Sequence, residues 1–307
     1  MKPKIGICGF GFVGKAIVHG FCLHSDLKIY DKFQDGLNTF DETVNDSDFI
    51  FVCVPTPMHE DGSQDLSAIY DVMDNINKMT NSGEIVNGST WATTTALSKS
   101  EYNLAGHGTT KIIIIKSTVI PGTTRKLANK YPKHSFIFNP EFLTERSAKL
   151  DFINTARIVI GGSSAFALDD VEKMYRTRFT HTPIFKTTWE GAELVKYMNN
   201  CFFALKISYL NEVYEICEKI GLNYNELKNM FLADQRIGNS HCDIPGHDGD
   251  KGFGGKCFIK DINALIKWAE KKGILMDTLN AAIKVNERVR SEKDWEKIKG
   301  ATTKNNY

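Results

Sequence analysis

Short apolar runs recur along the first half of the chain, and helical patterns separate them. The runs contain few polar positions, and the first four are rich in β-branched residues: Lys4–Cys8, Leu27–Tyr30, Phe49–Val54, Ile112–Ile115, Phe136–Phe138 and Ile158–Ile160. Such runs are typical of strands buried on both faces of a parallel sheet. Strands that alternate with helices indicate βαβ units. The pattern therefore predicts an α/β domain over residues 1–187.

One stretch of this half, residues 75–110, breaks the alternation. Asn-Ser-Gly, Gly-Ser-Thr and Gly-His-Gly punctuate it, and such clusters mark turns and loops. We expect an insertion on the surface of the sheet.

The second half has a helical pattern. Between Glu190 and Ile220 there is no proline, and apolar residues occupy positions 195, 198, 202, 205, 209, 213, 216 and 220. This spacing predicts one long helix that Gly221 ends. Further helices are expected over Tyr224–Ala233, Cys257–Lys272 and Asp277–Arg290, followed by a polar tail, residues 291–307, that frays.

Residues 188–290 would thus form an all-α domain built on the long helix. Apolar positions cover more than one narrow stripe of that helix, which suits a buried subunit interface. We therefore expect a homodimer.

Composition and charge exclude several classes of protein. The 307 residues include 38 Lys and Arg against 37 Asp and Glu, a net charge of +1, so bulk charge would hold neither nucleic acid nor a membrane surface. No apolar run approaches the about 18 residues of a membrane span, and the N-terminus lacks a signal-peptide cleavage pattern. The seven cysteines form no C-x-x-C pair, so neither disulfides nor a metal site is expected, and the cytoplasm is the predicted compartment.

The first candidate site is a glycine motif, Gly9-Phe10-Gly11-Phe12-Val13-Gly14, which follows a predicted strand and opens a helix. Asp31 ends the next strand 22 residues after Gly9, close to the spacing of about 20 in Rossmann dinucleotide-binding units. The helix N-terminus would face the pyrophosphate, and Asp31 would accept from the ribose hydroxyls. NAD is favoured over NADP, although Lys32 weakens this preference. A glycine turn without a ligand is the alternative.

Two further predicted strands end in hydroxyl and proline residues. Val54-Pro55-Thr56-Pro57 ends one, and Lys116-Ser117-Thr118 ends the other. Ligands bind at the carboxyl ends of strands in such sheets. We therefore expect these residues at the nicotinamide rim.

The long helix carries Lys196 and Asn200, four residues apart and so on one face. Such a pair could hold a substrate hydroxyl or polarise an oxygen that gains charge. The alternative, which spacing alone favours, is a solvated polar stripe beside Glu193.

A second glycine motif, Gly252-Phe253-Gly254-Gly255, precedes Cys257 at the predicted start of a helix. Free N–H groups and the helix dipole lower the pKa of a thiol there, so Cys257 is a candidate nucleophile. Asp261 lies one turn further on and could hold a water molecule.

Glu141 and Glu145 follow the strand Phe136–Phe138, in the segment Asn139–Glu145. A carboxylate at the carboxyl end of a strand is a candidate base. For Glu145, an acidic first turn of a helix is the plain alternative.

Together these motifs resemble the nucleotide-sugar 6-dehydrogenase family, over about residues 3–290. The motifs that carry the resemblance, in chain order, are Gly9–Gly14, Asp31, Val54–Pro57, Lys116–Val119, Asn139–Leu143, Arg157–Val159, Glu193–Asn200 and Gly252–Asp261. The resemblance implies an NAD-dependent oxidation of a sugar C6 alcohol in two hydride transfers, with UDP-glucose the expected substrate. Cys257 would add to the C6 aldehyde as a thiohemiacetal and pass through a thioester to the acid.

The resemblance also implies residue roles. Lys196 and Asn200 would stabilise the oxygen at C6, Asp261 and Thr118 would hold water, and Glu141 would be the base for hydrolysis. Residues implied at the cofactor are Gly9, Gly11, Phe12, Val13, Gly14, Asp31, Lys32, Pro55, Thr56, Thr118 and Glu145. Residues implied at the sugar are Glu141, Phe142, Leu143, Glu145, Lys196, Asn200, Arg236, Phe253, Gly254, Gly255 and Cys257, with Arg236 reaching a neighbouring subunit's site.

The chain departs from the family pattern at Ile259, where the family has proline or a polar residue, and in a longer loop over residues 239–251. Family members also continue, after the position of the last predicted helix, into a further domain that binds much of the UDP. The expectation is a short form that lacks this domain. A single-step dehydrogenase of the 3-hydroxyacid type and an inactive NAD-binding homologue are the alternatives.

Overall fold

A computed structural model describes residues 2–81 and 110–305, and its internal contacts divide the chain into two compact units. Unit 1 comprises residues 1–56 and 66–196, and unit 2 comprises residues 57–65 and 197–307. The long helix α8 (Trp189–Ile220) contributes its first turns to unit 1 and the rest to unit 2. The contacts thus divide the chain inside a helix, whereas the sequence placed the domain boundary before it.

Unit 1 is built on a seven-stranded sheet in the order β2-β1-β3-β4-β5-β6-β7. The strands are β1 (Lys4–Cys8), β2 (Asp26–Tyr30), β3 (Phe49–Val52), β4 (Ile112–Ile115), β5 (Ser135–Phe138), β6 (Ile158–Gly161) and β7 (Ile184–Thr187). Strands β1 to β5 are parallel to one another, whereas β6 pairs antiparallel with β5 through Phe138 and Gly161. The α/β fold predicted from the apolar runs is confirmed.

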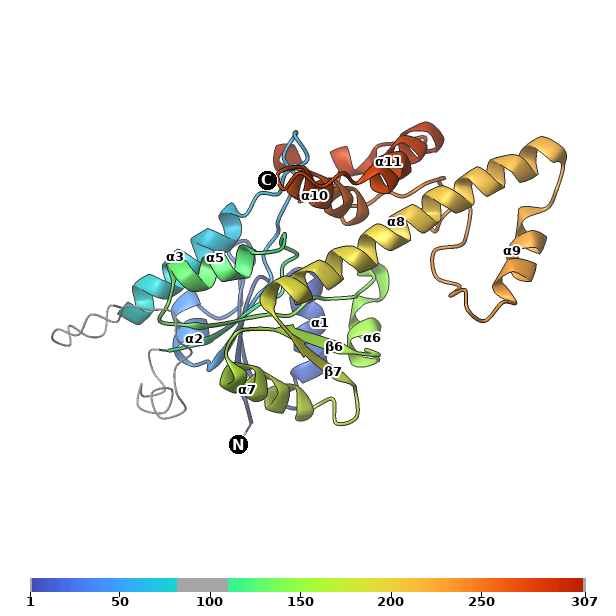
Figure 1. The fold of residues 1–307 in the computed structure, drawn as a ribbon. Helices are drawn as coiled ribbons and strands as arrows, with labels where there is room; N and C mark the ends of the chain where they lie inside the picture. The colour runs from blue at the N-terminus through green and yellow to red at the C-terminus, as the bar shows by residue number, and fades with distance from the viewer. Residues whose placement is uncertain (1, 82–109, 306–307) are drawn as a thin grey trace. The chain divides into compact units, whose positions relative to one another are not determined.

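Helices cover both faces of this sheet (Figure 1). Ile112 and Ile114 of β4 pack into one core, and Ile113 and Ile115 pack into the other, because successive strand residues point to opposite faces. The first core takes side chains from α1 (Phe12–Phe21), α6 (Ala148–Ile153) and α7 (Ala165–Arg176). The second takes them from α2 (Phe40–Asn45), α3 (Ser67–Asn81) and α5 (Thr123–Lys130). Both faces are buried, which explains why the strands show no polar alternation.

Unit 2 is helical apart from its loops. The rest of α8 is followed by α9 (Tyr224–Leu232), α10 (Phe258–Glu270) and α11 (Asp277–Val289). Gly221 and Gly273 follow α8 and α10 with φ of 73° each, the left-handed conformation expected of a glycine that ends a helix. The four predicted helices are confirmed to within two residues at each end.

Two expectations about irregular segments need correction. Residues 75–81 belong to α3 and do not begin an insertion, because the apolar side chains of α3 pack on the sheet; the remainder, residues 82–109, lies outside the described residues. The tail does not fray over residues 291–305. Trp295 and Ala301 are buried, and the backbone of Met58 exchanges hydrogen bonds with Ala301 and Thr303.

No helix in residues 2–81 and 110–305 is both long and apolar enough to cross a membrane.

A buried histidine should make the stability of unit 1 depend on pH. His134 is 6% exposed; its Nδ1 accepts from the backbone N–H of Lys111 at 3.3 Å, and its Nε2 lies 3.3 Å from Thr80 Oγ1. Protonation at Nδ1 would remove this acceptor, and burial lowers the pKa of His134 from 6.5 to about 4.

Below about pH 6.5 the unfolded chain therefore binds a proton that the folded chain does not, so the free energy of unfolding falls as the pH falls. Between pH 7 and pH 5 this loss should be about 2 kcal/mol. Glu193, whose pKa burial raises to about 7, acts in the opposite direction over this range, so urea unfolding should show the loss as the difference in pH dependence between the wild type and His134→Gln. The exposed His181→Gln should behave as the wild type; an equal loss in His134→Gln would contradict the assignment.

Candidate active site

The glycine motif forms the turn between β1 and α1. Gly9 has φ of 102°, and a side chain there would lie 2.5 Å from the carbonyl oxygen of Cys53. A Cβ on Gly14 would lie 2.1 Å from the carbonyl oxygen of Gly9, whereas a Cβ on Gly11 would meet no atom within 4 Å. Gly9 and Gly14 are thus required by packing. The open space at Gly11, the N-cap of α1, is where a phosphate could approach the helix N-terminus.

Asp31 lies beside this turn, at the end of β2. Its carboxylate accepts from the backbone N–H of Phe10 at 2.7 Å and from that of Phe33 at 2.9 Å. The two carboxylate oxygens retain lone pairs for a further donor, such as a ribose hydroxyl. Lys32 is directed to Asp71 on the surface, at 3.5 Å. Phe12 and Val13 form the first turn of α1.

The carboxyl ends of β3 and β4 are joined by hydroxyl groups. Thr56 Oγ1 donates to the carbonyl of Thr118 at 2.9 Å, and Ser117 Oγ donates to the carbonyl of Val54 at 2.7 Å. Pro55 and Thr56 therefore follow β3 next to the residues that follow β4, the arrangement expected of a rim.

A buried ion pair joins the segment after β5 to the first turns of α8. Lys196 Nζ lies 2.7 Å from Glu141 Oε1, with side chains 4% and 7% exposed. Glu141 Oε2 accepts from the backbone N–H of Leu143 at 2.7 Å. Burial raises the pKa of Glu141, but attraction to Lys196, these hydrogen bonds and Lys116 outweigh it and hold the pKa below its usual value. Glu141 is therefore a carboxylate at neutral pH.

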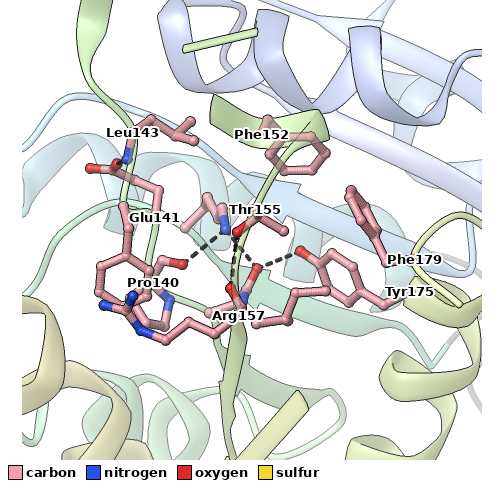
Figure 2. Close-up of a pocket in the computed structure, with 12 residues that line it drawn as sticks. Pro140, Glu141, Leu143, Phe152, Thr155, Arg157, Tyr175 and Phe179 are labelled. Atoms are coloured by element: carbon pink, nitrogen blue, oxygen red, sulfur yellow. Dashed lines mark hydrogen bonds between the residues drawn. The ribbon is translucent and has the colours of Figure 1, made fainter. Parts of the chain in front are cut away.

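A second buried ammonium, Lys116, lies near this pair. Its Nζ donates to Asn139 Oδ1 at 2.8 Å and to the carbonyl of Pro140 at 3.1 Å. Tyr175 donates to the same Asn139 oxygen at 2.6 Å, and these residues line a pocket that also reaches Glu141 (Figure 2). Burial lowers the pKa of Lys116 to about 8, and the Glu141 carboxylate limits the fall. None of the residues of the glycine turn lines this pocket.

The polar residues of α8 are not a solvated stripe. Glu193, Lys196 and Asn200 are all buried, so the alternative favoured by spacing alone is wrong. Glu193 accepts from the backbone N–H groups of Gly122 at 2.6 Å and Thr124 at 2.8 Å, at the N-terminus of α5. Burial raises its pKa to about 7, and these donors limit the rise.

In unit 2, Asn200 binds a carboxylate of α10. Asn200 Nδ2 donates to Asp261 Oδ2 at 2.6 Å, and Lys260 forms an ion pair with the other oxygen of Asp261. Asp261 is 1% exposed. An amide and an ammonium thus both bind this buried carboxylate.

Cys257 is the N-cap of α10 and is half-buried. Burial raises the pKa of Cys8 to about 12 and raises those of Cys53 and Cys201 further, which makes these thiols inert. Cys217 and Cys242 are also buried, and Cys22 is exposed beside the C-terminus of α1. Cys257 alone occupies a helix N-terminus, as predicted.

Four further predicted residues take no part in these hydrogen bonds. Arg236 is 89% exposed in its side chain and pairs with Asp234. Glu145 begins an exposed 3-10 turn (Glu145–Ser147). Phe142 packs under the guanidinium of Arg157, 4.1 Å from its ring centroid, and Phe253 is buried.

The partners of the predicted residues escaped the sequence analysis. Tyr175, Asn211, Asn286 and Asp294 all bind site residues or their loops across more than 30 positions of sequence. Asn211 and Asn286 lie within helices although asparagine is a poor helix former, and this was the local signal that could have pointed to such a role.

Comparison with known proteins identifies the family. Residues 28–107 and 99–179 match the NAD binding domain of the UDP-glucose/GDP-mannose dehydrogenase family, and residues 190–288 match its central domain. The chain belongs to this family. The match confirms the resemblance stated from the motifs and the expectation of an NAD-binding unit; the glycine turn precedes the matched residues.

Relatives named for UDP-glucose are similar over most of the chain. The UDP-glucose 6-dehydrogenase TuaD of Bacillus subtilis is 33% identical over 260 residues, which cover 82% of this chain and 49% of that protein. The structure of a UDP-glucose dehydrogenase from the archaeon Pyrobaculum islandicum matches with a TM-score of 0.77 and 27% identity, over 94% of this chain and 68% of that one. The chain thus spans about half the length of the curated relatives it matches.

A further similarity concerns the fold alone. The 3-hydroxyisobutyrate dehydrogenase of Mycobacterium tuberculosis superposes with a TM-score of 0.67 at 14% identity, over 94% of each chain. The two-unit architecture therefore also occurs in a dehydrogenase named for a 3-hydroxyacid.

The effects of substitutions at Glu141 and Lys196 on the free energy of unfolding should depend strongly on each other. Glu141→Gln leaves the ammonium of Lys196 buried without that carboxylate, so we expect unfolding free energy to fall by about 3–5 kcal/mol. Lys196→Met should cost a similar amount, and the double variant should cost less than the sum. Urea unfolding of the four proteins measures this coupling.

The exposed pair Asp170–Lys173 provides the control, since Asp170→Asn should change stability by less than about 1 kcal/mol. Additive costs at Glu141 and Lys196 would show that the pair contributes no coupling.

Proposed function

We propose that this chain carries the catalytic residues of an NAD-dependent dehydrogenase that oxidises the C6 alcohol of a nucleotide sugar to the acid in two steps. The observation that carries the proposal is Cys257, a half-buried thiol at the N-cap of α10, directly after a glycine loop. A single oxidation of an alcohol needs no nucleophile. A thiol that holds the aldehyde lets the second oxidation follow without release.

The residues of unit 1 fit NAD. The open backbone at Gly11, the N-terminus of α1 and the Asp31 carboxylate would hold the pyrophosphate and the ribose. NAD, when bound, accepts a hydride in each of the two oxidations. The carboxylate of Asp31 would repel a 2′-phosphate, which favours NAD over NADP.

Lys196 and Asn200 would bind the oxygen at C6. Their side chains donate hydrogen bonds from positions one turn apart on α8, and the Lys196 ammonium would stabilise that oxygen as it loses its proton. The bonds to Glu141 and Asp261 hold the two donors in place before substrate binds.

Cys257 would then add to the aldehyde. The Sγ–C6 bond forms, the aldehyde oxygen gains a proton and a thiohemiacetal results. Loss of a second hydride and of that proton leaves a thioester. Water, held by Asp261 and Thr118 and deprotonated by Glu141, attacks C6; the C–S bond breaks, and the acid and the thiol are released. The lowered pKa of Glu141 keeps this carboxylate ionised at neutral pH, so that it is able to accept a proton.

UDP-glucose is the proposed substrate, because the relatives described above are named for it. Glu145, Phe142, Leu143 and the glycine loop would lie around the sugar. Arg236, exposed and fixed by Asp234, is available to a neighbouring subunit as the family resemblance implies.

The proposal predicts two NADH for each acid formed from UDP-glucose. Cys257→Ala should reduce acid formation by about a thousandfold or more, because the nucleophile is removed. Absorbance at the NADH band and chromatography of the sugar products measure both quantities. The exposed Cys22→Ala is the control and should retain activity.

Other outcomes identify the alternatives. One NADH per product, unaffected by Cys257→Ala, would indicate a single-step dehydrogenase. NAD binding by calorimetry without turnover of any UDP- or GDP-sugar would indicate a protein that binds the cofactor only.

We also propose that the chain forms a homodimer through α8. Large apolar side chains at five positions of its unit 2 portion are 56–62% exposed: Met198, Phe202, Tyr209, Ile216 and Ile220. Such a row of apolar residues on one helix is typical of a subunit interface.

Light scattering should therefore give twice the mass of one chain. The double variant Phe202→Glu/Ile216→Glu should have the mass of one chain by light scattering. Its circular dichroism spectrum should show that it remains folded. Leu275→Glu, which alters a residue 80% exposed elsewhere in unit 2, should remain dimeric. A monomeric wild type would refute the interface.

A further inference from the structure

The glycine loop before Cys257 is held by side chains that come from distant parts of unit 2. Asn211 Oδ1 accepts from the N–H of Gly252 at 3.2 Å. Asn286 binds both backbone groups of Phe253, at 2.6 Å and 2.9 Å. Asp294 Oδ2 accepts from the N–H of Gly255 at 2.9 Å. The contact at Gly255 lies nearest to Cys257 in the chain.

Asp294 is in turn fixed by Arg290. The guanidinium of Arg290 lies 3.1 Å from Asp294 Oδ2 and 2.7 Å from Asp248 Oδ2, with its side chain 3% exposed. It also donates to the carbonyls of Lys251 and Glu292 at 3.3 Å and 3.0 Å. A buried guanidinium with acceptors in several directions has one orientation, and it directs the Asp294 carboxylate at Gly255.

The loop and these two side chains are in close contact. A Cβ on Gly254 would lie 2.0 Å from Arg290 Nη2 and 2.4 Å from Asp294 Oδ1. No side chain can therefore stand at Gly254 while Arg290 and Asp294 keep their positions. Gly254 is thus packed against the charged groups of Arg290 and Asp294, and Gly255 is joined to Asp294 by its N–H.

We infer that Asp294, oriented by Arg290, is a positioning residue that fixes Gly254 and Gly255 and thereby sets the place of Cys257 Sγ at the N-terminus of α10. The chemical consequence of this inference rests on the proposed function. A fixed Sγ captures the aldehyde when it forms. A loosened loop lets part of the aldehyde leave after a single hydride has been transferred, so the NADH formed per acid exceeds two.

The experiment compares Asp294→Ala with the unaltered protein by peptide-resolved hydrogen–deuterium exchange and by product analysis. Exchange in residues 252–257 should be about tenfold faster, which corresponds to about 1.4 kcal/mol, close to the lower limit for one hydrogen bond to a charged group. With UDP-glucose, the ratio of NADH to acid should rise above two, and semicarbazide should trap the aldehyde. Peptides of β1 should exchange at the unaltered rate.

Two conservative variants and one control complete the design. Asp294→Asn keeps an oxygen acceptor for Gly255 and should restore part of the protection, and Arg290→Lys should give an intermediate effect. Arg288→Gln removes the arginine in the last turn of α11, whose partner is Glu215 on the surface, and should change neither the exchange nor the ratio. If Asp294→Ala does not fold, Arg290→Lys and Asp294→Asn provide the same readouts.

Each result either supports or overturns the positioning role of Asp294. Unchanged exchange in the loop, or faster exchange with a ratio that stays at two, overturns the positioning role. Faster exchange confined to the loop in a chain that never turns over UDP-glucose supports the fixing of the loop by Asp294 and overturns the proposed function instead.

Discussion

The polar side chains that helix α8 buries include Glu193, Lys196 and Asn200, and each of these must have a partner because an unpaired polar or charged group in the interior costs several kcal/mol. Within unit 1, Glu193 binds the N-terminus of α5 and Lys196 binds Glu141. Within unit 2, Asn200 binds Asp261 of α10. The partners belong to three separate segments. Polar pairs along α8 therefore determine which side of the helix is buried. The residues assigned to the chemistry are the same residues that the fold requires to be paired.

The buried side of α8 carries these polar residues together with apolar ones such as Tyr197, Ala204 and Leu210. Large apolar residues at 198, 202, 209, 216 and 220 remain exposed. Periodicity predicted the bounds of the helix to within one residue, since spacing depends only on the backbone period. It could not predict which face is buried. That depends on partners such as Glu141, 55 positions away in the chain.

Elsewhere too, the sequence could predict features that depend on local residue patterns and could not predict those that depend on distant contacts. Strands buried on both faces, such as Ile112–Ile115, were read directly from their apolar runs. Edge strand β7 was missed, because three of its four residues are exposed and its composition is mixed. Candidate residues in compact motifs, such as Cys257, were found by local chemistry. Tyr175 and Asp294 were not, because their roles arise from contacts across 36 and 39 positions.

The charges around Glu141 do not balance, and the imbalance has a chemical use. Lys116 and Lys196 contribute two ammonium groups against one carboxylate, and the hydrogen-bond acceptors of Lys116 are the neutral Asn139 and Pro140. A balanced pair would offer little net field to an oxygen that gains negative charge, whereas an excess cation favours that charge in a site shielded from water. Burial already lowers the pKa of Lys116 to about 8, so an anion nearby would be stabilised and would restore the ammonium. In the proposed reaction, the oxygen at C6 is the group that would supply the missing negative charge.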